Sequence, residues 1–167
     1  VKSKLSQAWN TVRATKKFRD NEVFAWDSVL DKYIDCSNAY KIFVGIVEDD
    51  FPFATHIHSH QIVGYSDSRG HSLNVGDRTI CSQSGHTRIQ FNESDLLKDG
   101  DVYTSVVDTR HPHNSLTSAT WILYKNGQKI HTLQKLNLTG FSPSVALIYD
   151  TQVTLRVNSN WYKLATN

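Results

Sequence analysis

Residues 121–130 read WILYKNGQKI, two strand-forming runs joined through Asn126-Gly127. A two-residue hairpin of type I′ needs positive φ at both turn positions, which Asn tolerates and Gly adopts without penalty. The residues before the turn are aromatic and branched aliphatic, types that are enriched in strands. This stretch therefore predicts an antiparallel hairpin with its turn at Asn126-Gly127.

Short runs of the same character follow one another along the chain, separated by polar clusters. That spacing is typical of an all-β sandwich or barrel. Only SQAWNTVRA (6–14) offers a candidate start for a helix. The predicted strands are VFAWDSVL (23–30), KIFVGIV (41–47), DVYTSVVDT (101–109), ATWILYKNG (119–127), QKIHTL (128–133), SPSVALIY (142–149) and QVTLRV (152–157).

Two runs also predict how their strands are buried. KIFVGIV is apolar on both faces, which favours a central strand, and Gly45 within it indicates a bulge or the close approach of another backbone. In VFAWDSVL the side chains alternate, so Val23 and Ala25 oppose Phe24 and Trp26 across the sheet. Both patterns indicate two packed β layers.

Composition limits the classes of function. A chain of 167 residues favours one domain, residues 1–167, and a net charge of +2 gives no polybasic surface for nucleic acid or anionic lipid. The longest apolar run, IFVGIV (42–47), falls far short of the roughly 18 residues of a membrane span. We therefore expect a soluble protein that binds neither nucleic acid nor membrane.

Two cysteines, Cys36 and Cys81, are too few for a disulfide framework. We expect reduced, partly buried thiols and hence a cytoplasmic location, and a Cys36–Cys81 disulfide is the alternative.

The segment THIHSH (55–60) raises the question of a metal site. His56, His58 and His60 would share one face of a strand, and Asp49 or Asp50 could complete a zinc site. We favour solvated imidazoles, because no second ligand cluster stands at a characteristic spacing. No nucleophile elbow or triad order is present either, so we expect no enzyme activity, no metal and no cofactor.

The order of motifs resembles the SPRY domain family over Trp9 to Val157. Two departures are FAWD (24–27), where the family often has Tyr-Trp-Glu, and Leu123-Tyr124, where it often has Phe. The resemblance implies a SPRY-type antiparallel β-sandwich with long loops at one end and a core of about 9–157. The motifs are WNTVRATKKF (9–18), EVFAWDSVL (22–30), NAYKIFVGIV (38–47), IVGYSDSRG (62–70), KDGDVYTSVVDTR (98–110), ATWILYKNGQKI (119–130) and FSPSVALI (141–148).

The resemblance also implies a function: a monomeric, non-catalytic protein-interaction module. Such modules bind a short linear peptide or a folded partner, often for a ubiquitin ligase or a signalling assembly. The alternative is a carbohydrate-binding sandwich of the concanavalin-like kind. Long polar stretches at 48–85 and 109–118 would supply binding loops on a rigid support. Aromatic residues and Arg are enriched among interface anchors. By motif position the partner-binding residues are Arg13, Thr15, Lys17, Phe51, Phe53, Tyr65, Tyr149 and Asp150.

Overall fold

The structure is a computed structural model that describes residues 10–33, 42–49, 70–82, 85–89, 97–110, 119–136, 138, 140–147 and 151–166. Almost all of its regular structure is strand, and one 3-10 helix, η1, lies near the C-terminus. The elements are β1 (Asn10–Arg13), β2 (Val23–Lys32), β3 (Ile42–Glu48), β4 (Gly70–Asn74), β5 (Thr79–Ser82), β6 (Gly85–Arg88), β7 (Val102–Asp108), β8 (Ala119–Lys125), β9 (Gln128–Leu136), β10 (Phe141–Leu147), β11 (Gln152–Val157) and η1 (Trp161–Thr166).

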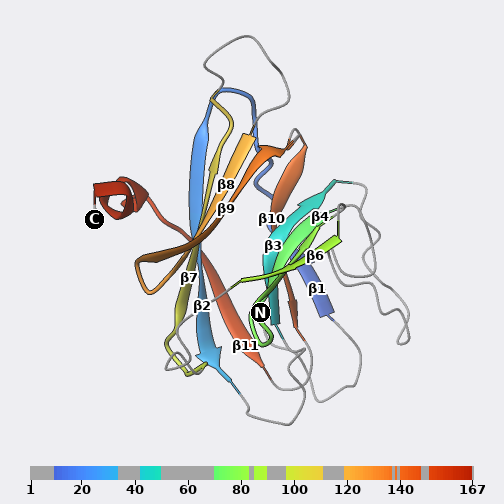
Figure 1. Ribbon diagram of the computed structural model, residues 1–167, viewed down its shortest axis with the longest axis vertical. Helices are drawn as coiled ribbons and strands as arrows, with labels where there is room; N and C mark the ends of the chain where they lie inside the picture. Colours follow the sequence, from blue (N-terminus) through green and yellow to red (C-terminus); the bar gives the residue numbers. More distant parts are fainter. Residues whose placement is uncertain are drawn as a thin grey trace.

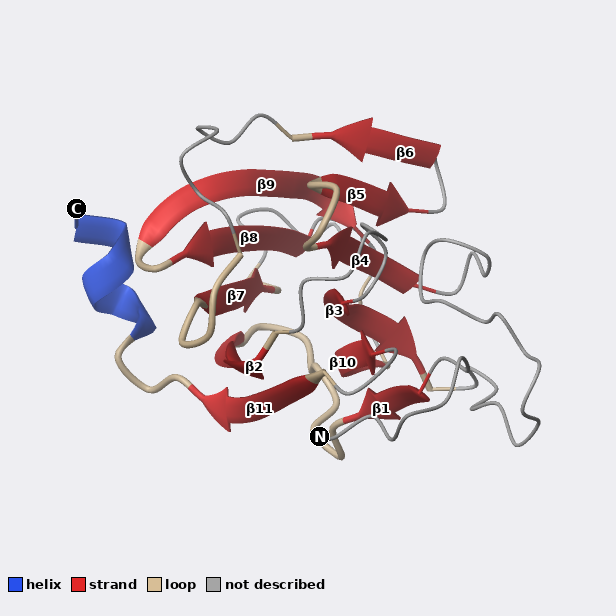
Figure 2. Ribbon diagram, turned by 90° about the horizontal axis from the view of Figure 1, so that it is seen from below, coloured by secondary structure: helices blue, strands red, loops and turns tan. Residues whose placement is uncertain are grey.

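The strands form two antiparallel sheets that face each other (Figure 1). One sheet, called sheet A, has the order β11-β2-β7-β8-β9; the other, sheet B, has the order β1-β10-β3-β4-β5-β6. Strands β1 and β11 are edge strands, and they lie at the same side of the sandwich (Figure 2). The predicted all-β antiparallel sandwich is confirmed.

The main core fills the space between the sheets. Alternation along β2 sends Phe24, Trp26 and Leu30 into it, while Ala25 belongs to a separate cluster on the outer face of sheet A. The fully buried Trp121 of β8 packs in the same core. Burial of this apolar surface supplies most of the stabilising free energy of such a domain.

Strand β3 is the central strand that its sequence predicts, with residues 42–47 buried. Gly45 pairs in register with Ser72 of β4, and no bulge interrupts the pairing. A Cβ atom at Gly45 would overlap the carbonyl oxygen of His71 and lie 2.8 Å from the Cα of Ser72. The close approach of a second backbone, one of the two predicted reasons for this glycine, is therefore the one that applies.

The predicted hairpin joins β8 to β9. Asn126 has φ 49° and Gly127 has φ 85°, as a type I′ turn requires. The side chain of Asn126 also accepts a hydrogen bond from the amide of Val102 at 2.8 Å and donates one to Asp101 Oδ1 at 2.9 Å. The turn is thus tied to the Gly100-Asp101 turn that precedes β7.

Four strands were not predicted. The candidate helix at SQAWNTVRA is wrong for Asn10–Arg13, which pairs with β10 as strand β1, and residues 6–9 lie outside the described residues. Strands β4 and β5 arise within the stretch 48–85 that we read mainly as loop, and β6 begins at its last residue. Strand β4 reads GHSLN, and its buried residues are mostly small or polar, so no alternation of apolar side chains marks it. Pairing with β3 and β5 holds it in the sheet.

The short helix η1 lies against the outer face of sheet A (Figure 1). Its Trp161 and Leu164 pack on Ala25, Val106 and Tyr124. This cover explains why the second face of β2 is apolar at Ala25 as well. None of the described helices has the length and hydropathy of a membrane span.

Candidate functional site

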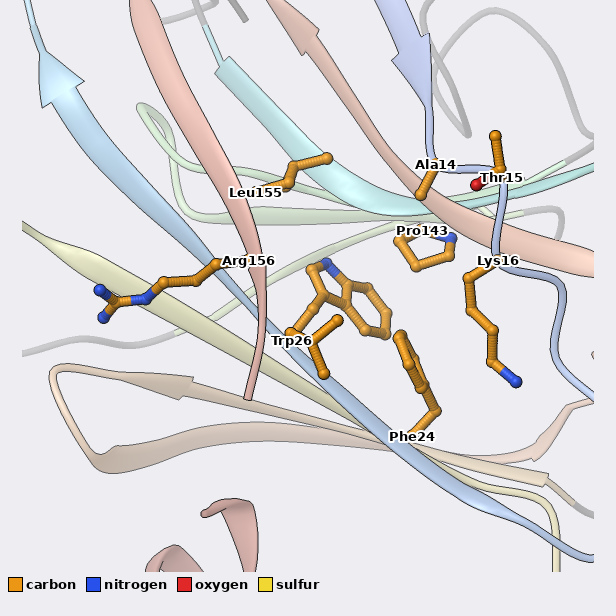
Figure 3. Close-up of a pocket in the computed structure, with 9 residues that line it drawn as sticks. Ala14, Thr15, Lys16, Phe24, Trp26, Pro143, Leu155 and Arg156 are labelled. Carbon is orange, nitrogen blue, oxygen red and sulfur yellow. The ribbon is translucent and has the colours of Figure 1, made fainter. Parts of the chain in front are cut away.

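A pocket of about 200 Å³ opens at the side of the sandwich where β1 and β11 form the two sheet edges. The segment after β1 forms one wall, and the end of β11 forms the other (Figure 3). Phe24 and Trp26 of β2 and Pro143 of β10 lie between these walls. The lining residues are Ala14, Thr15, Lys16, Phe24, Trp26, Pro143, Leu155, Arg156 and Val157.

Two aromatic rings, Phe24 and Trp26, line this pocket, and Phe18 packs against both of them. Trp26 lies 5.7 Å from Phe18 and 6.0 Å from Phe24 between ring centroids, and both pairs are stacked. Phe18 reaches the cluster because its amide donates to the carbonyl oxygen of Phe141, which holds the segment after β1 along β10. The cluster is rigid because strands and stacked rings hold every member.

The indole nitrogen of Trp26 is the main polar feature among these rings. Trp26 is only 2% exposed, and its Nε1 has no hydrogen-bond partner among the described residues. In Figure 3 this nitrogen lies on the edge of the ring nearest Leu155. A buried donor without an acceptor costs free energy, and this nitrogen is shielded from solvent, so it is a local cost within the core and no contact point for a ligand.

Basic residues surround the mouth of the pocket, and most hold a carboxylate. Arg13 Nη1 lies 3.4 Å from Asp49 Oδ1, and Lys17 Nζ contacts the other oxygen of the same carboxylate. Arg13 also donates to the carbonyl oxygen of Glu48 at 3.4 Å. These two bases thus tie the segment after β1 to the end of β3.

Lys16 makes a separate ion pair. Its Nζ lies 2.8 Å from Glu22 Oε1 and 5.1 Å from the centroid of the Phe24 ring. Burial acts to raise the pKa of Glu22, but hydrogen bonds from Lys16 and from the amide of Arg19 outweigh it and lower the pKa. Glu22 therefore stays charged and keeps Lys16 over the aromatic ring.

Arg156 lines the pocket near its backbone, and the end of its side chain points away from the pocket. Its guanidinium lies on the far side of the β11 ribbon from Trp26 (Figure 3). There its Nε donates to Asp27 Oδ2 at 3.0 Å, while the side chain remains 59% exposed. The remaining guanidinium nitrogens face water at the sheet edge.

The structure describes only some of the predicted partner-binding residues, and one of those lines the pocket. Thr15 lines the pocket, and Arg13 and Lys17 flank it on the same segment. The other predicted residues, Phe51, Phe53, Tyr65, Tyr149 and Asp150, lie outside the described residues, as do His56, His58, His60 and Cys36.

Strand register gives one further result on the predicted site. Arg13 pairs with Ser144, whereas Leu147, the last described residue before Tyr149, pairs with Asn10 at the other end of β1. The described residues that flank the predicted site thus lie at, or pair with, opposite ends of β1.

Sequence reasoning missed the apolar part of the pocket. Phe24 and Trp26 were predicted only to share one face of a strand; they pack in or against the main core and also form the pocket wall. Pro143 and Leu155 were assigned to strands alone. The pocket lies here because β1 and β11 are edge strands, and only the pairing order of the strands shows this position.

The described histidines and Cys81 do not form a reactive centre. Cys81 is a buried free thiol, and burial followed by the charge of Asp77 raises its pKa to about 12, so it stays protonated. No group of three His, Cys, Asp or Glu side chains within the described ranges is placed to hold a metal ion.

The buried His71 should make the stability of the fold depend on pH. The ring is buried beside Phe141, and burial lowers its pKa to about 4, so folding keeps it neutral while the unfolded chain binds a proton below about pH 6.5. Stability should therefore fall as the pH drops from 6.5 and level off below 4, with a loss of about 2 kcal/mol by pH 5. Urea unfolding of wild type and His71→Phe at pH 7 and pH 5 measures this loss. Equal pH dependence in both proteins would contradict it.

Two solved structures share the fold over nearly the whole chain. The SPRY domain of human HERC1 has a TM-score of 0.61 at 12% identity, covering 91% of this chain and 83% of that one. A human SPRY domain has a TM-score of 0.61 at 14% identity, with 93% and 87% covered.

A third structure, carbohydrate binding module CBM66 from Bacillus subtilis, has a TM-score of 0.45 at 7% identity, covering 94% of this chain and 89% of that one. A TM-score this low does not show a shared fold. No protein-family model matches the sequence, and no curated protein matches it. The motif resemblance is thus confirmed at the level of structure: the chain has the fold of SPRY domains.

Proposed function

We propose that this protein is a non-catalytic interaction module that binds an extended segment of a protein partner at the pocket between β1 and β11. The observation that carries the proposal is the apolar pocket of about 200 Å³, which is lined by the stacked rings of Phe24 and Trp26 and bordered by Lys16. A concave apolar site with one or two fixed polar groups is the usual form of a recognition pocket.

The chemistry of the pocket indicates its ligand. Phe24, Pro143 and Leu155 offer apolar contact, which suits an apolar anchor side chain. Next to the anchor, an amide or acidic oxygen would accept a hydrogen bond from Lys16 at the rim. A short peptide with an apolar residue beside an acidic or amide residue combines both features.

The first test is selection of peptides on the immobilised protein from a random linear library. Titration calorimetry then compares the best peptide on two variants with the same chemical change. Thr15→Arg introduces a long side chain at a pocket-lining position, whereas Thr87→Arg changes an exposed residue of β6, at the opposite edge of sheet B. We expect the first to raise Kd about tenfold or more, which corresponds to about 1.4 kcal/mol, and the second to leave it within about twofold.

Thermal melting gives the folding control, because both positions should tolerate arginine with little change in Tm. Equal affinity of Thr15→Arg and Thr87→Arg would place the binding surface elsewhere. A protein that selected no peptide but bound glycans on an array would instead favour the carbohydrate-binding alternative.

Finer features of the proposal come from the SPRY likeness. Delivery of the partner to a ubiquitin ligase or signalling assembly, a monomeric state and a cytoplasmic location remain parts of this proposal. So do the roles of Arg13, Lys17, Phe51, Phe53, Tyr65, Tyr149 and Asp150 in partner binding. Affinity capture followed by a peptide scan of the retained proteins would identify the partner.

A further inference from the structure

We infer that the partner segment binds as an added β-strand on the open edge of β11, so that sheet A gains a sixth strand beside the pocket. This inference rests on the proposed function and names how the segment is held. Strand addition draws its affinity from main-chain hydrogen bonds and its specificity from pockets for alternate side chains.

The backbone of β11 is oriented for such pairing. Arg156 pairs with Asp27 of β2, and the amide of Asn158 donates to the carbonyl oxygen of Ala25 at 2.9 Å. Main-chain groups of an antiparallel strand alternate in direction, so residues 156 and 158 point toward β2. The N–H and C=O groups of Leu155 and Val157 therefore point away from β2, toward the side where the pocket opens.

The side chains continue the same pattern. Val157 lies opposite Trp26 in register, and both belong to the face that lines the pocket. A residue of an added strand opposite Val157 would extend this cross-strand row by one position. Its side chain would enter the space between Trp26 and the wall formed by Ala14 and Pro143 (Figure 3).

The C-terminal half of β11 lacks the features that usually protect an edge strand. Edges are commonly blocked by proline, by a bulge or by an inward-pointing charge. The register shift of β11 lies at Gln152/Val153, away from the pocket, and Leu155 and Val157 are apolar on the inward face. Val157 is 70% exposed, the most exposed large apolar side chain among the described residues.

Charge indicates what the added strand carries. The charged residues that line the pocket, Lys16 and Arg156, are both basic and stand on opposite walls. Among the described residues, Arg156 donates to Asp27 through its Nε atom, and its side chain is largely exposed. In an added strand the residue next to the pocket residue points to the opposite face, where the Arg156 guanidinium lies, so an acidic residue at that position complements Arg156.

Amide hydrogen exchange measured by NMR tests the inference on the full chain with the selected peptide. Bound peptide should slow exchange at Leu155 and Val157 about tenfold or more, because their amides gain acceptors, and leave Arg156, which already pairs with β2, unchanged. Unchanged exchange at Leu155 and Val157 at saturating peptide would overturn strand addition.

A pair of variants separates backbone from side chain. Val157→Pro removes an amide that points away from β2, so the β11–β2 ladder should persist, whereas Val157→Ala keeps the amide and shortens the side chain. We expect the proline variant to weaken peptide binding about tenfold and the alanine variant about twofold or less. Equal losses in both variants would overturn strand addition.

The outcomes distinguish the two proposals. If Thr15→Arg weakens binding while the edge amides stay unprotected, the pocket function stands and strand addition fails. If no peptide is selected, both fail. If sedimentation shows that the chain alone dimerises and protects the same amides, the occupant of the edge is a second copy, and the peptide inference is overturned.

Discussion

Replacing Gly45 with alanine should abolish the folded state under ordinary conditions. The added Cβ would overlap the carbonyl oxygen of His71 and lie 2.8 Å from both Cα and Cβ of Ser72. Two of these atoms are backbone of β4, paired in the middle of sheet B, so β3 and β4 would have to separate. We expect a loss above about 4 kcal/mol, the range reached by few single substitutions.

Gly140→Ala is the matched control for this prediction. Gly140 has φ 83°, but a Cβ there meets nothing within 4 Å, so only backbone strain of about 1 kcal/mol should result. Urea unfolding followed by circular dichroism compares the two variants. Similar stability of Gly45→Ala and Gly140→Ala would rule out a close approach of β3 and β4 as the reason for Gly45.

Asp101→Ala should also cost much of the stability of the domain, about 3 to 5 kcal/mol. The Asp101 side chain is fully buried, with Lys125 Nζ at 3.4 Å, and it accepts the amides of Lys98 and of the Asn126 side chain. Removing the carboxylate leaves a buried ammonium without this counter-charge and frees the side chain of the hairpin turn. Urea unfolding measures the change.

Two further variants identify the cause of the Asp101 effect. Adding Lys125→Met to Asp101→Ala should recover part of the loss, because the buried ammonium that lost the Asp101 carboxylate is then removed as well. Asp108→Ala breaks the more exposed pair with Arg110, at 2.7 Å, and should cost about 1 kcal/mol or less. If Asp101→Ala is no more costly than Asp108→Ala, the buried pair does not stabilise the fold.

The strands that could be predicted are those whose sequence pattern reflects the environment of their side chains. KIFVGIV is apolar throughout because both faces of β3 are buried, and WILYKNGQKI carries a turn that only a hairpin explains. Strand β4 contains a single large aliphatic residue, Leu73, since its outward positions pack small and polar groups. Its conformation is set by neighbouring strands, and no local pattern encodes it.

The pocket was only partly predictable for a related reason. Thr15 follows from a motif position, but the identity of the aromatic wall depends on which strands end each sheet. Trp26 satisfies every expectation for a core residue except that its Nε1 lacks a partner, a property of three-dimensional placement. Edge position and unpaired donors come from long-range pairing, which composition and periodicity do not reveal.

The segment from Ala14 to Glu22 has a consequence for the kinetics of binding. Its far end is pinned to the end of β7, because the amide of Glu22 donates to Thr109 Oγ1 and the amide of Thr109 donates to Glu22, both at 2.9 Å. The near end follows β10. A partner that docks against such a preorganised wall loses little conformational entropy in ordering it. Association should then proceed without a slow rearrangement step, and differences among partners should appear mainly in dissociation rates.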